Sequence, residues 1–196
     1  YLFKDMKKEG WTEEYLLQKI DHYISSLPND EKYIYKRSGK DYKKGDLKIN
    51  EINEENDRVN RTKAAIELFK EYNHLLRSKS LIDFEDVILM VIEAFEKHKN
   101  LLLRYQEQFQ FILVDEYQDS NGAQNRLLRL LCEYDDPNIF VVGDDDQAIY
   151  RFQGANMANI EEFYELFRPK IYVLSNNYRS QQKILDSAHS LIEYNF

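Results

Sequence analysis

Two neighbouring acidic residues, Asp115 and Glu116, directly follow the apolar run Phe111 to Val114 in the segment FILVDEYQDS. A short apolar run of this kind is typical of a strand that is buried on both faces of a sheet. In an open α/β sheet, ligands bind beyond the carboxyl ends of the strands. The two carboxylates are therefore expected where a metal-bound phosphate could be handled.

A second apolar run, Ile139 to Val142, ends in the same way. The residues that follow it are Gly143, Asp144, Asp145, Asp146 and Gln147. Between the two runs, leucines recur at helical spacing within residues 122–133, so strand, helix and strand form a βαβ unit. The sequence therefore predicts an α/β fold with a parallel sheet that delivers acidic residues from two strands to one edge.

Three segments resemble consecutive motifs of the UvrD/Rep helicases of superfamily one, in that family's order and spacing. They are VDEYQDS at 114–120, VVGDDDQAIYRFQGA at 141–155 and LSNNYRS at 174–180. The resemblance runs from about Leu81 to Leu191, whereas residues before about Ala65 resemble no family. It implies a partial RecA-like (P-loop NTPase) parallel sheet with a mainly helical inserted subdomain.

The resemblance also implies that the strand ends bind Mg²⁺ and ATP. Asp115 is expected to hold magnesium through water, and Glu116, beside the metal, to accept the proton of the hydrolytic water. Gln147 would sense the γ-phosphate, while Gln118 and Asp119 would couple the nucleotide state to the neighbouring loop. The alternative is that the acid pair only caps the helix that follows.

In the resembled family the tyrosine of the NYR motif stacks on adenine and the arginine reaches the γ-phosphate as an arginine finger, which implies these roles for Tyr178 and Arg179. The residues that the resemblance places on a single-stranded DNA track are Tyr150, Arg151, Phe152 and Gln153. Gln153 stands where the family commonly carries arginine, which puts its contact in question. Phe152 is equally explained as a packing residue.

No GxxxxGK[ST] phosphate loop occurs in the sequence, and the SGK at 38–40 lacks the preceding glycine that such a loop requires. The later motifs of a second motor lobe are absent too. We therefore expect an internal fragment of a longer helicase that by itself neither hydrolyses ATP at a useful rate nor unwinds DNA.

The most basic stretch, residues 31–48, interleaves lysines and an arginine with tyrosines. Basic side chains bind phosphates without reading sequence, and tyrosines can stack on bases. The stretch is therefore a candidate contact with duplex or single-stranded DNA. The alternative is a solvated turn region.

Apolar residues at helical spacing predict further helices. One runs from Thr12, an N-cap, to Leu27, and another from Leu81 to Asn100 with Asp83 as its cap. The other predicted helices span 53–77, 101–108, 159–167 and 180–193, and a third strand is predicted at 171–174.

The 196 residues carry a formal net charge of −8, which argues against a protein that coats nucleic acid with its whole surface. With 43% hydrophobic residues the chain can form a core. The single cysteine, Cys132, excludes a disulfide framework and is predicted to be a buried packing thiol. No apolar run approaches a membrane span, so a soluble, cytoplasmic protein is expected.

The expected organisation is a helical inserted subdomain at 1–80, part of the first RecA-like motor lobe at 81–175 and the start of the second lobe at 176–196. By its resemblance, the parent protein would be an ATP-dependent DNA helicase that uses Mg²⁺, moves 3′-to-5′ on single-stranded DNA and unwinds duplex DNA. Two alternatives stay open: the helicase part of a helicase-nuclease, and a catalytically silent nucleic-acid-binding scaffold. Protein partners do not follow from the sequence.

Overall fold

The computed structural model describes residues 1–134, 137–144 and 157–192, and the chain divides into two compact units, 1–102 and 103–196. The helices of unit 1 are α1 (Leu2–Glu9), α2 (Glu13–Ser26), α3 (Ile49–Glu67), α4 (Phe69–Ser78) and α5 (Asp86–Lys97). Helix α6 (Lys99–Gln108) contains the boundary. The elements of unit 2 are β1 (Ile112–Val114), the 3₁₀ turn η3 (Tyr117–Asp119), α7 (Gly122–Leu131), β2 (Ile139–Val141), α8 (Met157–Phe167) and α9 (Gln182–Ile192).

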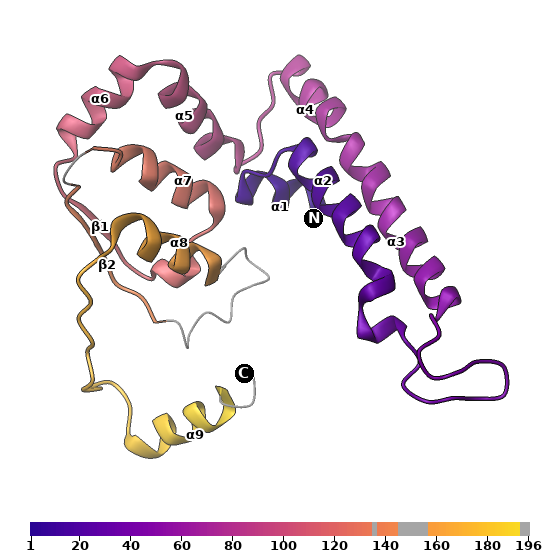
Figure 1. Ribbon diagram of the computed structural model, residues 1–196. Helices are drawn as coiled ribbons and strands as arrows, with labels where there is room; N and C mark the ends of the chain where they lie inside the picture. Colours follow the sequence, from indigo (N-terminus) through magenta and orange to yellow (C-terminus); the bar gives the residue numbers. More distant parts are fainter. Residues whose placement is uncertain (135–136, 145–156, 193–196) are drawn as a thin grey trace. The chain divides into compact units, whose positions relative to one another are not determined.

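In unit 1, α2 and α3 lie side by side as a helical hairpin (Figure 1). The predicted N-cap of α2 is confirmed, because the Thr12 hydroxyl oxygen accepts a hydrogen bond from the Tyr15 N–H at 3.1 Å. Helix α1, in contrast, has no counterpart among the predicted helices. Its apolar residues are few, and only its packing partners reveal the face that it buries.

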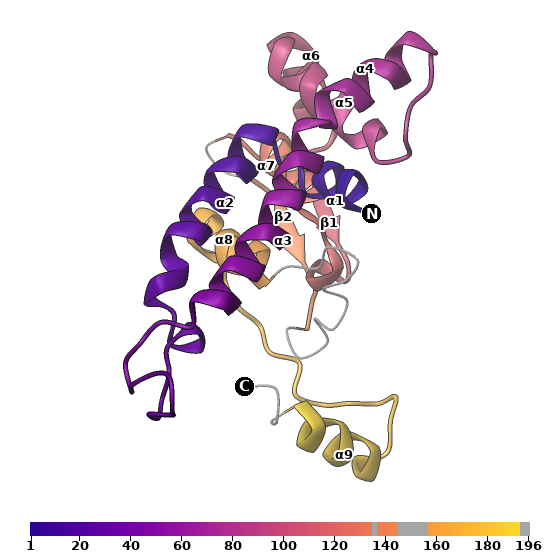
Figure 2. The ribbon, with the colours of Figure 1, turned by 90° about the vertical axis from the view of Figure 1, so that its right-hand side faces the viewer.

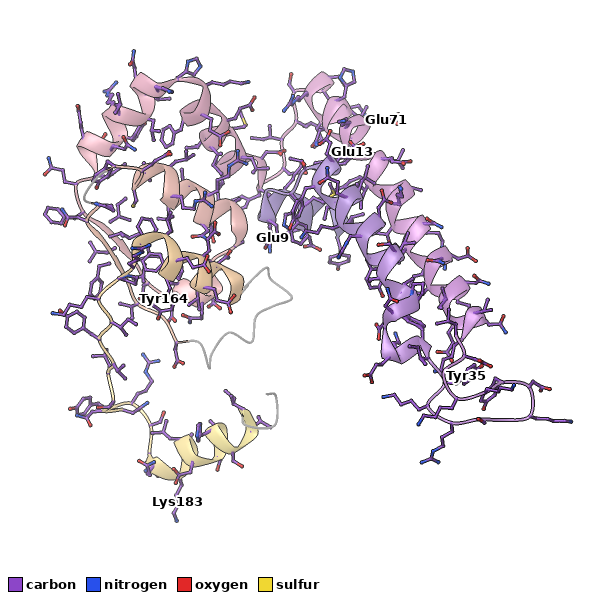
Figure 3. All side chains as sticks on the ribbon, viewed as in Figure 1. Glu9, Glu13, Tyr35, Glu71, Tyr164 and Lys183 are labelled. Atoms are coloured by element: carbon purple, nitrogen blue, oxygen red, sulfur yellow. The ribbon has the colours of Figure 1, made fainter. Side chains whose placement is uncertain are left out.

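The basic stretch forms the loop that joins α2 to α3, where Figure 3 labels Tyr35. Ile34 and Leu47 pair in an antiparallel bridge that closes the loop at its base. Within it, the rings of Tyr35 and Tyr42 stack with their centroids 3.7 Å apart. The tyrosines thus pack on one another in this structure, and the contact of the loop with DNA stays a prediction.

The prediction of one continuous helix over 53–77 is wrong, because α3 ends at Glu67 and α4 begins at Phe69. The Phe3 ring of α1 lies 5.4 Å from the ring of Phe69 and 4.9 Å from that of Tyr72. These contacts orient α4 toward α1. A tertiary contact of this kind overrides a helical pattern that is continuous in the sequence.

The predicted capping role of Asp83 is also wrong, since this carboxylate pairs with a buried lysine instead. The Lys7 side chain is 1% exposed, and its Nζ lies 2.6 Å from Asp83 Oδ2 and 2.9 Å from an oxygen of Asp86. The Tyr72 hydroxyl donates a further hydrogen bond to Asp83 at 2.8 Å. Burial alone would lower the pKa of Lys7, but the bonds to the two carboxylates outweigh it and raise that pKa.

In unit 2, β1 and β2 pair in parallel, with Ile112 opposite Ile139 and Val114 opposite Val141, and Figure 2 shows them side by side. Helix α7 connects them, so the predicted βαβ unit and its parallel pairing are confirmed. The described residues therefore combine many helices with a small two-stranded parallel sheet.

The expectation that these strands are buried on both faces is wrong for the chain as described. Ile112, Val114 and Val141 are half-buried, whereas Leu113 on the opposite face is 76% exposed. A third strand is not present at 171–174, where the chain is irregular and its apolar side chains are exposed. A strand requires a hydrogen-bonding neighbour, and the described residues offer this segment none.

Cys132, at the end of α7, is buried as predicted, and burial raises the pKa of its thiol to about 11. A thiol of this kind is a packing group and not a nucleophile. In the part of the chain that the structure describes, no helix is both long and apolar enough to cross a membrane.

The substitution Lys7→Met is expected to lower the free energy of unfolding of unit 1 by about 3 kcal/mol, because it leaves two part-buried carboxylates without their cation. Urea unfolding followed by Trp11 fluorescence measures this, since Trp11 is the single tryptophan and lies in unit 1. The control is Lys36→Met, which removes an exposed ion pair with Glu31 and should cost less than about 0.5 kcal/mol. Equal losses in the two variants would contradict the buried cluster.

The Lys7 cluster also predicts a pH dependence of stability. The hydrogen bond from Lys7 holds the pKa of Asp83 below its ordinary value. The ionised carboxylate therefore stabilises the fold at pH values above the pKa of an unfolded aspartate, about 4. This stabilisation is lost as the pH falls through the lower pKa that Asp83 has in the folded chain. The stability difference between wild type and Lys7→Met should therefore narrow as pH falls below about 4. A constant difference down to about pH 2 would contradict this, because it would show that the charge of Asp83 does not contribute to the difference.

Candidate functional site

The acid pair lies at the carboxyl end of the sheet, where the chain leaves β1. The Val142 N–H donates to the carbonyl of Val114 at 2.8 Å, and the Tyr117 N–H donates back to the carbonyl of Val142 at 2.9 Å. Asp115 and Glu116 sit between these two bonds, and both are exposed. The bonds hold the two strand ends together, so the acids of the first strand and the residues after the second share one edge.

Glu116 has the left-handed backbone conformation, with φ 50° and ψ 46°. For a residue with a Cβ this conformation costs roughly 1 to 2 kcal/mol, and it persists only where the surroundings hold it. Here the Glu116 N–H donates to Asp115 Oδ1 at 3.0 Å, and Gln118 Nε2 donates to Glu116 Oε2 at 2.7 Å. The strain sits on the residue that the sequence singled out as a base, and strain of this kind clusters at functional sites.

Gln118 connects the two strand ends through its side chain. It is 3% exposed, and while its Nε2 donates to Glu116, its Oε1 accepts from the Asp144 N–H at 3.1 Å. A Cβ on Gly143 would lie 3.0 Å from this Oε1, so glycine permits the close approach. The amide therefore contacts both Glu116 and the loop after β2. The predicted coupling of the nucleotide state to a neighbouring loop stays a prediction.

The residue that follows the acid pair, Tyr117, is buried and hydrogen-bonded. The Tyr117 hydroxyl donates to Asn125 Oδ1 at 2.5 Å, and its ring lies 5.2 Å from that of Phe163. Burial raises the pKa of Tyr117 to about 12, so the hydroxyl stays protonated. Sequence reasoning missed Tyr117, Asn125 and Asn159. The one signal in the sequence was that Tyr117 directly follows the acid pair, and its partners on α7 and α8 carry no such signal.

The acid pair is a donor set that suits magnesium. Among the residues that the structure describes, no group of three or more His, Cys, Asp or Glu side chains could hold a metal ion. Magnesium dehydrates reluctantly and is bound through one or two carboxylates together with waters and substrate phosphates, so it needs no cage made only of protein side chains. Two exposed neighbouring carboxylates, Asp115 and Glu116, fit that requirement.

Tyr178 and Arg179 lie on the segment that leads into α9. Asn177 Oδ1 accepts hydrogen bonds from the backbone N–H groups of Arg179 and Ser180, both at 2.9 Å, and this turn precedes the helix. The Tyr178 side chain is 93% exposed, and within the described ranges no hydrogen bond or ion pair joins it or Arg179 to the acid pair.

The structure therefore brings together Asp115, Glu116 and Gln118, but does not bring Tyr178 and Arg179 to them. The other predicted site residues lie outside the described residues: Gln147, Tyr150, Arg151, Phe152 and Gln153. Their roles stay predictions.

The substitution Gln118→Leu should remove both bonds of the buried amide while keeping its bulk. The Asp144 amide is expected to exchange its hydrogen faster, by about fivefold or more, because an intramolecular hydrogen bond contributes about 1 kcal/mol. Hydrogen exchange followed by NMR measures this. The matched control is Gln124→Leu, which removes the exposed capping-box bond to Asn121 at the start of α7 and should leave Asp144 unchanged. An unchanged exchange rate in Gln118→Leu would contradict the link.

Comparison with known proteins shows similarity over most of the chain. The family described as UvrD/REP helicase N-terminal domain matches residues 3–168. DNA helicase II of Haemophilus influenzae is 40% identical over 149 residues, 76% of this chain and 20% of that protein. ATP-dependent DNA helicase PcrA of Bacillus subtilis is 39% identical over 130 residues, 66% of this chain and 18% of that protein. ATP-dependent DNA helicase Rep of Buchnera aphidicola is 37% identical over 132 residues, which are 65% of this chain and 20% of that protein.

The chain spans about a fifth of the length of these curated relatives. The family match begins at residue 3, well before Leu81, where the resemblance carried by the three motifs begins. The expectation that residues before about Ala65 resemble no family is therefore wrong, because the match includes nearly all of unit 1. Since the match covers far more than half of the sequence, the chain belongs to the UvrD/REP helicase family.

Proposed function

We propose that this chain is part of an ATP-dependent DNA helicase that couples the hydrolysis of Mg²⁺-ATP to movement along single-stranded DNA. The observation that carries the proposal is the buried Gln118 amide, which joins the strained Glu116 to the loop after β2. A link between the hydrolytic residue and a neighbouring loop is what a motor needs in order to turn hydrolysis into movement.

In this proposal, residues 81–175 form part of a first RecA-like lobe, residues 1–80 a helical subdomain inserted into it, and residues 176–196 the start of a second lobe. The parallel βαβ unit supports the assignment of the lobe. The helical hairpin of α2 and α3 supports that of the subdomain.

The acid pair would act on the γ-phosphate of ATP. Magnesium, when bound, neutralises charge on the β- and γ-phosphates. Asp115 would hold the ion through water, and Glu116 would accept the proton of the attacking water. The bond from Gln118 fixes one carboxylate oxygen of Glu116, which leaves the other oxygen to face the water. Gln147 would contact the γ-phosphate and report whether it is present.

Tyr178 and Arg179 would complete the site from the second lobe. The tyrosine would stack on adenine, and the guanidinium would stabilise the charge that develops on the γ-phosphate, as an arginine finger does. Their exposure leaves both side chains available for a nucleotide. Closure of two lobes around ATP would bring them to the acid pair.

DNA would bind at two places. Bases of a single strand would stack on Tyr150 and Phe152, with Arg151 and Gln153 beside them, and the direction of movement would be 3′-to-5′. The basic loop within residues 31–48 would contact duplex phosphates. Its exposed lysines, on a chain with a net charge of −8, support a local track for a polyanion.

The proposal predicts that Glu116→Gln in the full-length parent lowers kcat for ATP roughly a hundredfold to ten-thousandfold, because the amide cannot accept the proton. Nucleotide binding should persist, which fluorescent ATP analogues measure. The matched control is Glu161→Gln, which alters an exposed glutamate of α8 and should leave kcat unchanged. A wild-type parent that binds DNA but shows no ATPase with or without it would instead favour the silent scaffold.

The isolated 196-residue chain is expected to show no useful ATP turnover, because its sequence contains no GxxxxGK[ST] loop to cradle the phosphates. A phosphate-release assay with Mg²⁺ and single-stranded DNA checks this. Detection of magnesium-dependent turnover that disappears on Glu116→Gln would overturn the expectation.

A further inference from the structure

Tyr117 directly follows the strained Glu116 in the chain, and its own contacts restrict where that residue can move. The Tyr117 side chain is 3% exposed, and its hydroxyl lies 2.5 Å from Asn125 Oδ1 on α7 and 3.4 Å from the carbonyl of Asn159 on α8. The residue after Glu116 is therefore tied to two helices at once.

A second set of bonds closes the network from α8. Asn159 Nδ2 donates to the carbonyl of Ser120 at 2.9 Å, and the Ser120 hydroxyl donates to the carbonyl of Tyr117 at 2.6 Å. Asn125, Ser120 and Asn159 are all buried. Each of these residues thus has a hydrogen-bond partner, and the turn after the acid pair is held at both of its ends.

Helix α8 is held to α7 by its own charged residue. Glu162 forms an ion pair with Arg129 and accepts a hydrogen bond from Asn125 Nδ2 at 3.3 Å. In the sequence, α8 begins at Met157, four positions after residues 150–153, to which the proposed function assigns the single-stranded DNA. A shift of α8 would therefore move Asn159 and Glu162, and through their hydrogen bonds it would act on Tyr117 and Asn125.

Packing alone does not require these polar groups. A phenylalanine would fill the position of Tyr117 against Phe163, and burial of a hydroxyl or an amide costs free energy unless it is hydrogen-bonded. The left-handed conformation of Glu116 costs roughly 1 to 2 kcal/mol, and the hydrogen bonds of the network offset that cost. The network therefore stabilises the left-handed conformation of Glu116 against the conformations that an unstrained residue would adopt.

We propose that Tyr117, Asn125 and Asn159 are positioning residues that make the conformation of Glu116 depend on α8, so that single-stranded DNA stimulates ATP hydrolysis through their hydrogen bonds. The inference rests on the proposed function and adds the residues by which DNA acts on the hydrolytic site. None of the three touches nucleotide or DNA in this account.

The test compares DNA-stimulated and basal ATPase in the full-length parent. Tyr117→Phe removes the hydroxyl but keeps the ring, and Asn159→Ala removes the bond to Ser120. Each is expected to lower the ratio of kcat with a single-stranded oligonucleotide to kcat without it by about fivefold, in the range of ordinary coupling energies. Basal kcat should fall by clearly less than the stimulated kcat, and the KM for ATP should stay within about twofold of wild type. The double variant should be no worse than either single one, because both act through one network.

The matched control is Gln106→Leu, which removes a comparable bond, from Gln106 Nε2 to the carbonyl of Leu130 at 2.8 Å, outside the network. It should lower the melting temperature as Tyr117→Phe does and retain wild-type stimulation. If the control lost stimulation equally, the effect would be one of stability alone and the inference would fail. The inference would also fail if Tyr117→Phe and Asn159→Ala kept full stimulation, or if basal and stimulated kcat fell together.

Failure of the proposed function gives a different result. A wild-type parent without DNA-stimulated hydrolysis would remove that function and this inference with it. A stimulated wild type whose variants are stimulated equally would overturn the inference alone. Should one variant not fold, the other decides, because the two remove different bonds of the same network.

Discussion

The parallel pairing of β1 with β2 is the constraint on which the candidate site depends. It places the carboxyl ends of both strands at one edge, and the backbone bonds between Val114, Val142 and Tyr117 carry the pairing beyond the last ladder residue. An antiparallel partner would have put the residues after β2 at the opposite edge, away from Asp115 and Glu116. The side chain of Gln118 spans the strand ends only because the backbone has already brought them together.

Each unit contains a cluster of buried polar side chains that are paired with one another or with backbone groups. In unit 1, Lys7 is enclosed by two carboxylates and lies 5.0 Å from the centre of the Tyr72 ring. In unit 2, Tyr117 and Gln118 are enclosed by amide and backbone groups. Buried polar groups add little net stability but accept only one geometry, whereas an apolar core tolerates several. Apolar contacts thus drive the packing of each unit, and the buried polar contacts fix the orientation of the side chains beside them.

What the sequence predicted well depended on local pattern. The apolar run before Asp115, the leucines of α7 and the Thr12 cap each act within a few residues, so the strand, the crossover helix and the start of α2 could be read directly. The break at Leu68 and the pairing of Lys7 with Asp83 depend on residues far apart in the sequence. The exposed Leu113 and the irregular 171–174 show that a strand-like pattern does not supply its own neighbours. The role of Tyr117 could not be predicted from the sequence, because its partners on α7 and α8 are asparagines that stand out by neither type nor spacing.

The central claim is that one nucleotide is held jointly by groups from separate motifs of this chain. The most direct measurement is a structure of the full-length parent with Mg²⁺ and a non-hydrolysable ATP analogue. The account predicts the γ-phosphate and the hydrated metal beside Asp115 and Glu116, with the Tyr178 ring on the adenine and Arg179 at the γ-phosphate. A nucleotide bound away from the carboxyl ends of β1 and β2, or one that Tyr178 and Arg179 do not touch, would contradict it.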